Sequence, residues 1–164
     1  MNKRLKAIFF YALFWMVFFV TARLFFILTH FREASAFNPA MLSLTFWHGI
    51  MLDFSAIGYI LIIPLLIIMP GVYFTGKWFR SFIKWYTYVF LVISAVIVVS
   101  DTLLYKYWGF RMDYTPLVYL KTPKAAMASV TTFQIAGVAM GIVLLSALFI
   151  FFYRRFSMFC KFRR

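Results

Sequence analysis

Four long apolar runs limit what this chain can fold into. They predict helices at about residues 7–28, 44–69, 85–108 and 133–153, and at about 1.5 Å per residue each is long enough to cross the roughly 30 Å hydrocarbon core of a bilayer. The chain is 65% hydrophobic over 164 residues, too apolar for a water-exposed fold of this length. The sequence therefore predicts an all-α polytopic integral membrane protein with one membrane domain over residues 1–164.

The first run follows a short basic lead, as the hydrophobic region of a signal peptide does. It is longer than such a region and rich in Phe, and no Ala-x-Ala cleavage site follows it. We interpret it as an uncleaved first transmembrane helix, with a cleaved signal as the alternative. The second run contains Pro64, which lacks an amide hydrogen and is expected to kink the helix where neighbouring helices cover the bend.

The Lys and Arg residues indicate how the chain is oriented. They number 17 against four Asp and Glu, but they cluster at the ends of the apolar runs, which is typical of membrane topology and not of nucleic-acid binding. The N-terminus, the 71–84 connection and the 154–164 tail share one side and hold eleven of them. The opposite side holds Arg32, Lys106, Arg111, Lys121 and Lys124. The positive-inside rule predicts cytoplasmic termini, a cytoplasmic basic tail and an extracytoplasmic segment over residues 109–132.

Two charged residues interrupt the first two apolar runs. Arg23 and Asp53 both fall in the outer half of the membrane by this topology. Charges at this depth normally face the helix bundle and have partners. One interpretation is a structural ion pair between the first two helices. The other is a polar notch, formed together with His48, that admits an anionic lipid headgroup from the outer leaflet.

The stretch from residue 101 to 129 is the only long one that is neither uniformly apolar nor a short basic turn. Its aromatic and charged residues suit the membrane interface; the candidates for a functional role are Asp101, Tyr105, Trp108, Arg111 and Asp113. The third helix is expected to end at Trp108 with Gly109 as its break. Arg111 and Asp113 either pair or, as adjacent loop charges usually do, remain solvated. A short helix is predicted over residues 124–129. The segment is either an interfacial hairpin that seals the bundle or a docking platform for an extracytoplasmic partner.

Other features of the chain are less specific. Gly137 and Gly141 have the Gly-x-x-x-Gly spacing that allows close helix approach, and Cys160, the single cysteine, excludes an internal disulfide. The chain has no Gly-rich phosphate loop, no His, Asp and Glu cluster at metal spacing and no plausible Ser-His-Asp set. The sequence therefore predicts no catalytic, cofactor-binding or metal-binding residue.

A series of short motifs nevertheless resembles a known family. They are Trp47-His48-Gly49, Leu52-Asp53-Phe54-Ser55-Ala56, Ser100-Asp101, Leu104-Tyr105, Trp108-Gly109-Phe110-Arg111-Met112-Asp113, Pro116-Leu117 and Tyr119-Leu120. Over nearly its whole length the chain resembles the membrane domain of lipoteichoic-acid-synthase-like proteins, phosphotransferases of the sulfatase and alkaline-phosphatase superfamily, in the form found in Bacteroidetes-type bacteria.

The resemblance implies a place in the bacterial cytoplasmic membrane and a larger architecture. Such proteins have five transmembrane helices followed by an extracytoplasmic catalytic domain with a Thr nucleophile and a divalent metal. Its members transfer phosphoglycerol or related headgroups from lipids, and some are sulfatase-like hydrolases. This chain has four predicted helices and nothing that matches the Thr or the metal ligands. No catalytic residue can be carried over, and the metal would belong to a catalytic domain outside this chain. The end of the sequence where a fifth helix is expected suggests a truncated or split reading frame, or an excerpt.

The sequence-based hypothesis is thus a membrane-anchoring and lipid-presenting domain, inactive by itself. Its expected partners are membrane lipids, an anionic phospholipid among them, and an extracytoplasmic catalytic domain or a further helix, with no nucleic acid. The alternative is a self-sufficient membrane scaffold or assembly protein. A transporter subunit is a weaker rival, because no internal repeat is apparent.

Overall fold

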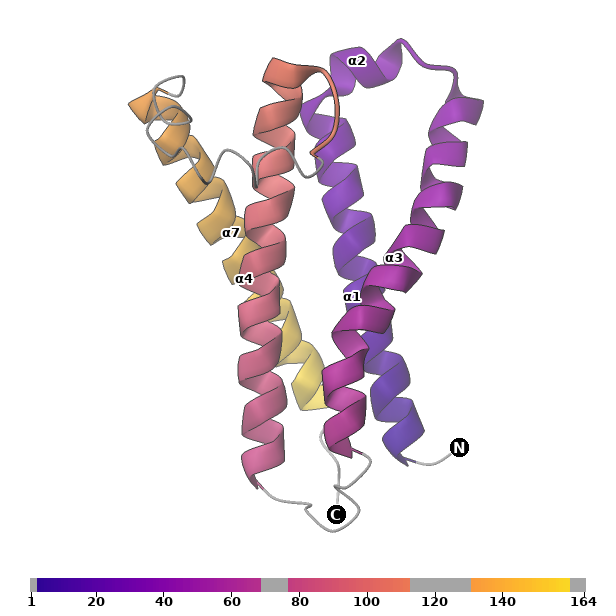
Figure 1. Ribbon diagram of the computed structural model, residues 1–164, viewed down its shortest axis with the longest axis vertical. Helices are drawn as coiled ribbons and strands as arrows, with labels where there is room; N and C mark the ends of the chain where they lie inside the picture. The colour runs from indigo at the N-terminus through magenta and orange to yellow at the C-terminus, as the bar shows by residue number, and fades with distance from the viewer. Residues whose placement is uncertain (1–2, 69–76, 113–130, 160–164) are drawn as a thin grey trace. The chain divides into compact units, whose positions relative to one another are not determined.

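The computed structural model describes residues 3–68, 77–112 and 131–159. Every element in these ranges is an α-helix, and the order is α1 (Lys3–Thr29), α2 (Phe31–Ser35), α3 (Pro39–Ile68), α4 (Lys77–Trp108) and α7 (Thr132–Phe159) (Figure 1). Four of them, α1, α3, α4 and α7, are long and apolar enough to cross a membrane. The chain is an all-α polytopic membrane protein.

Each long helix begins before its apolar run, and α1 and α7 also end beyond theirs, whereas α4 ends at Trp108 as predicted. α3 begins at Pro39, five residues before the run from residue 44, because the Asn38 side chain accepts a hydrogen bond from the Ala40 amide at 3.1 Å and Pro39 takes the first helical position. α4 begins at Lys77 and not near residue 85, and α7 continues through Arg154 to Phe159. Hydropathy marks the part of a helix that lies in hydrocarbon, whereas the hydrogen-bonded backbone continues through the basic residues at its ends. The predicted helix at 124–129 lies outside the described residues.

The chain divides into two compact units. The first comprises residues 1–87 and 153–164, and the second comprises residues 88–152. The first unit therefore holds α1, α2, α3, the beginning of α4 and the end of α7, and the second holds the rest of α4 and of α7.

Aromatic side chains form the core of the first unit. Trp15 on α1 is fully buried and meets Phe14 and Phe18 edge to face, with ring centroids 5.8 and 5.6 Å apart. The Phe14 ring also contacts the Tyr153 ring of α7, with ring centroids 5.4 Å apart. The buried positions 14, 18 and 22 recur every four residues, so they form one stripe along α1. α1 crosses α3, and the two helices then separate toward α2 (Figure 1).

A tyrosine compensates for the proline in α3. Pro64 lies inside the helix and is buried, and because proline has no amide hydrogen, the carbonyl of Ile60 loses its usual intrahelical donor. The Tyr86 hydroxyl of α4 donates to that carbonyl at 2.8 Å. A neighbouring helix thereby satisfies a backbone group that would otherwise be left unpaired in a lipid environment.

The second unit packs α4 against α7. Buried residues of α4 recur at Leu91, Ala95 and Val99, and a Cβ added to Gly141 of α7 would lie 3.2 Å from the Val99 Cγ1. Gly137, the other glycine of the predicted motif, has nothing within 4 Å of the corresponding position. Only one of the two glycines therefore serves a helix contact among the described residues.

The beginning of α7 is capped by its own side chains. The amide of Thr131 donates to the Gln134 Oε1 at 2.9 Å, and the Gln134 amide donates to the Thr131 hydroxyl at 3.4 Å, which is a capping box. The Gln134 side-chain amide also donates to the Tyr107 hydroxyl. This contact joins the beginning of α7 to the last turn of α4.

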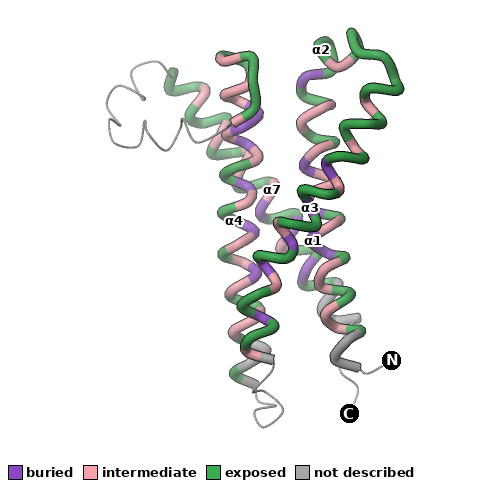
Figure 2. Tube along the Cα trace, turned by 45° about the vertical axis from the view of Figure 1, so that its right-hand side comes forward, coloured by how far each residue is buried: buried purple, intermediate pink, exposed green. Residues whose placement is uncertain are grey.

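Most of the apolar surface of the long helices is exposed. Figure 2 shows this most clearly on the part of α3 that follows α2, where Met41, Leu44, Trp47 and Met51 are all exposed. A soluble protein rarely leaves apolar patches of this extent in water. In a bilayer these faces contact acyl chains or other helices.

Candidate functional site

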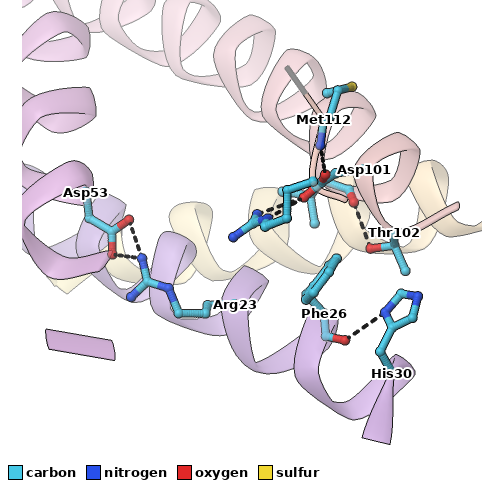
Figure 3. A network of polar contacts seen from close by, with 9 residues as sticks. Arg23, Phe26, His30, Asp53, Asp101, Thr102 and Met112 are labelled. Carbon is cyan, nitrogen blue, oxygen red and sulfur yellow. Dashed lines mark hydrogen bonds and ion pairs between the residues drawn. The ribbon is translucent and has the colours of Figure 1, made fainter. Parts of the chain in front are cut away.

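The two intramembrane charges form an ion pair between α1 and α3. The Arg23 Nη2 donates to both carboxylate oxygens of Asp53, each at 2.9 Å (Figure 3). The two side chains are 10% and 9% exposed, so the pair is almost completely removed from solvent. The opposite charges of an arginine and a carboxylate attract each other strongly in this environment, whereas either one alone would be costly at this depth.

A glycine makes room for the arginine. A Cβ added to Gly49 of α3 would lie 2.2 to 2.5 Å from the guanidinium carbon and both terminal nitrogens of Arg23. Real Cβ atoms do not approach so closely, so any larger residue at position 49 must displace the guanidinium. The Phe46 ring lies on the same helix, with its centroid 5.7 Å from the Arg23 Cζ, within the range of a cation–π contact.

The pair leaves one arginine nitrogen without a partner. Arg23 Nη1 is buried and makes no hydrogen bond to any described residue. A fork-to-fork arrangement would use two guanidinium nitrogens, but here Nη2 alone donates to the carboxylate. A buried N–H group without an acceptor costs about 1–3 kcal/mol.

His48 does not join the pair. Its side chain is exposed, and the ring Nδ1 lies 2.9 Å from the carbonyl of Leu44 one turn earlier on α3. The structure thus brings together two of the three residues predicted for this site. It adds Gly49, which the sequence analysis did not consider for this site. The spacing could have indicated it, since Gly49 lies four residues before Asp53 and on the same helix face.

A second carboxylate, Asp101, anchors the turn at the end of α4. Its Oδ2 accepts from the Arg111 Nε at 3.0 Å and Nη2 at 2.7 Å, and its Oδ1 accepts from the Met112 amide at 2.6 Å (Figure 3). The turn is possible because Gly109 adopts a positive φ of 72° directly after the helix. The Gly109 amide still donates to the Tyr105 carbonyl at 2.9 Å.

The remaining candidates of this segment surround that turn. Trp108 stacks on Phe110 with ring centroids 5.7 Å apart, and Tyr105 is half-buried on the last turns of the helix. Arg111 pairs with Asp101 and is not described with Asp113, which lies outside the described residues. Asp101 and Arg111 are ten residues apart, so the sequence offered Asp113 as the nearer partner.

The chemistry of both carboxylates is limited by their partners. Each carboxylate accepts hydrogen bonds from an arginine. The arginine balances the negative charge of the carboxylate and fixes its position. Within the described ranges, no group of three or more His, Cys, Asp or Glu residues is placed to hold a metal ion.

Comparisons with models of protein families, with curated proteins and with solved structures give no match for this chain. The function therefore has to be argued from the residues themselves.

Proposed function

We propose that the chain is the membrane domain of a lipoteichoic-acid-synthase-like phosphotransferase, which anchors an extracytoplasmic catalytic domain and presents lipid to it. The observation that carries the proposal is the Asp101 turn. The resemblance rests in large part on residues 100–113, and within them Arg111 and Met112 both donate hydrogen bonds to Asp101. A hydrogen-bonded cluster is what a motif with a common structural role is expected to form.

The turn is suited to supporting another domain. A buried carboxylate with three hydrogen bonds fixes residues 110–112 against α4, and Tyr107 and Phe110 remain exposed beside them. Rigid exposed aromatic side chains are favoured at protein interfaces and at the headgroup level of membranes. The cluster therefore combines a fixed backbone with a surface that another domain or the lipid interface can contact.

The proposal includes an orientation, with both termini in the cytoplasm and the Asp101 turn outside the cytoplasmic membrane of a bacterium. It is supported by the excess of Lys and Arg on the terminal side. We expect an impermeant thiol reagent to label intact cells carrying Lys121→Cys in a Cys160→Ser background and to leave native Cys160 unlabelled. Labelling of Cys160 without labelling of position 121 would reverse the orientation.

A chimaera tests the proposed function. The first four helices of a five-helix enzyme of this type are replaced by this chain, and its fifth helix and catalytic domain are kept. We expect the chimaera to transfer labelled phosphoglycerol from phosphatidylglycerol in vesicles with Mn²⁺. Asp101→Asn should lower the turnover by at least about tenfold through misplacement of the catalytic domain. Glu33→Gln, which changes an exposed acid of α2, is the matched control and should leave turnover unchanged.

The same experiment separates the alternative function. A chimaera that inserts normally but transfers no headgroup would favour a self-sufficient membrane scaffold. The exposed surface around Gly137, which has nothing within 4 Å of its missing Cβ, is open to a helix of another protein.

The purified chain alone is expected to show no turnover with labelled lipid and Mn²⁺. Turnover that disappears with Asp101→Asn would identify it as an enzyme.

A further inference from the structure

The ion pair between α1 and α3 is poorly arranged for stability alone. One nitrogen of Arg23 serves both oxygens of Asp53, and Nη1 is buried without an acceptor among the described residues. Replacing a buried ion pair by apolar side chains is often neutral or stabilising. The arrangement therefore calls for a role other than strengthening the contact between the helices.

Gly49 gives the pair a defined position on α3. The guanidinium lies where the glycine has no side chain, with three of its atoms within 2.5 Å of the missing Cβ. Gly58, further along the same helix, has nothing within 4 Å of its own missing Cβ. The close approach at position 49 is thus specific to Arg23 and is not a general property of glycines on α3.

The apolar residues of α1 and α3 specify their alignment weakly. Lipid tails are as apolar as Phe, Ile and Leu, so such side chains gain little by choosing one partner over another. A charged pair is different. If α1 slid by one turn, Phe19 or Phe26 would face the glycine notch, and Arg23 and Asp53 would be left unpaired inside the bilayer.

We propose that Gly49, Arg23 and Asp53 form a register lock between α1 and α3. In this lock the ion pair and the notch accept one alignment of the two helices and penalise the others. A single polar contact that selects a register at some cost in stability has a precedent in coiled coils. The lock does not depend on the proposed function, and its test measures no activity.

Glycine-to-alanine substitutions test the lock in two backgrounds. In the wild-type background Gly49→Ala should lower the melting temperature in detergent by about 5 °C or more, because the guanidinium has to move and then loses its hydrogen bonds to Asp53. In the Arg23→Ala/Asp53→Ala background the notch is empty, and Gly49→Ala should leave the melting temperature unchanged or raise it, since Ala favours helix. Gly58→Ala is the matched control and should behave alike in both backgrounds. An equal loss for Gly49→Ala in both backgrounds would refute the lock.

Cysteine cross-linking in native membranes reads the register directly and needs no detergent-stable variant. In a Cys160→Ser background, a cysteine at Ala22 is combined in turn with cysteines at each α3 position from 54 to 60. With the lock intact, cross-linking should be confined to a narrow set of positions on one face of α3. In the Arg23→Ala/Asp53→Ala variant it should spread to neighbouring positions. An unchanged profile would show that apolar packing alone sets the register and would overturn the proposal.

Discussion

Two arginine–aspartate pairs among the residues that the structure describes differ in their surroundings. Arg23 and Asp53 are 10% and 9% exposed and join two helices 30 residues apart in the chain. Arg111 is 62% exposed, its partner Asp101 only 7%, and the two lie ten residues apart around one turn. A single arginine nitrogen, Arg23 Nη2, donates to both oxygens of the first carboxylate, whereas Arg111 donates to the second through two nitrogens, beside the Met112 amide.

The difference shows how one kind of pair serves two purposes. Between α1 and α3, water does not solvate either charge, so each charge depends on the other. The pair therefore constrains how the two helices align. At the end of α4, the arginine is exposed to solvent or headgroups, and only the carboxylate depends on its partners. The first pair is therefore expected to be sensitive to loss of either member. In the second pair water can take the place of the exposed guanidinium, so loss of the aspartate, which also holds the Met112 amide, should matter more.

Removing one charge from the intramembrane pair should have the largest effect. Arg23→Met or Asp53→Leu breaks the ion pair and leaves the other charge buried, at a cost of about 3–5 kcal/mol, and the double variant should cost less than either. Thermal unfolding in detergent measures the cycle. Arg32→Met, at an exposed position of α2, should change stability by no more than about 0.5 kcal/mol. Additive effects of the two substitutions would mean that the pair does not interact, and the lipid-notch interpretation would gain.

Removing the charge of Asp101 should have the next largest effect. Asp101→Asn weakens the charge-assisted hydrogen bonds from Arg111, and we expect a loss of about 1.5–3 kcal/mol. Arg111→Met should cost only about 0.5 kcal/mol, because the place of the exposed guanidinium is open to water, which can then solvate the carboxylate, and the Met112 amide still donates to it. Limited proteolysis near residues 109–112 would show the local loosening. Equal losses for the two variants would contradict the asymmetry between the partners.

A hydrogen bond between uncharged groups in the first unit, from Tyr86 to Ile60, gives a reference energy for the two ion pairs. Tyr86→Phe leaves the Ile60 carbonyl without its donor and should cost about 1 kcal/mol, as side-chain hydrogen bonds between membrane helices do. In a Pro64→Ala background the cost should disappear, because the alanine restores the intrahelical amide. Tyr59→Phe, at an exposed tyrosine of α3, is the control. A persistent cost in the Pro64→Ala background would show that the hydroxyl has another role.

The smallest expected effect is that of salt on the stability of the two pairs, and it should differ between them. Raising the ionic strength from about 0.1 to about 1 M shortens the Debye length from about 10 to about 3 Å. The cost of Arg111→Met should then fall by a few tenths of a kcal/mol, because an exposed pair is screened. The cost of Arg23→Met should stay the same. A salt dependence of the buried pair would show that water reaches it.

The spans could be predicted because each is an apolar run longer than the bilayer core, a property of consecutive residues. The ends of the helices were less predictable. Lys77 and Arg154 are helical although they lie outside the apolar runs that hydropathy identifies. The short helix α2 has no apolar run that would have predicted it. Arg23 and Asp53 were identifiable as candidate partners because isolated charges in apolar runs require compensation. Whether they meet depends on the rotation and depth of two helices, which hydropathy does not encode.

The sequence by itself determined the membrane class, the four spans and the asymmetry of basic residues, since these follow from solvation of consecutive residues. Only the tertiary structure decided which partner each charge takes. It placed Gly49 under the Arg23 guanidinium, left His48 exposed, and assigned Arg111 to Asp101. It also supplied the Tyr86 hydroxyl for the carbonyl that Pro64 leaves open. Such pairings join residues 10 to 30 positions apart, and their choice depends on shape and distance between elements that lipid solvation alone leaves undetermined.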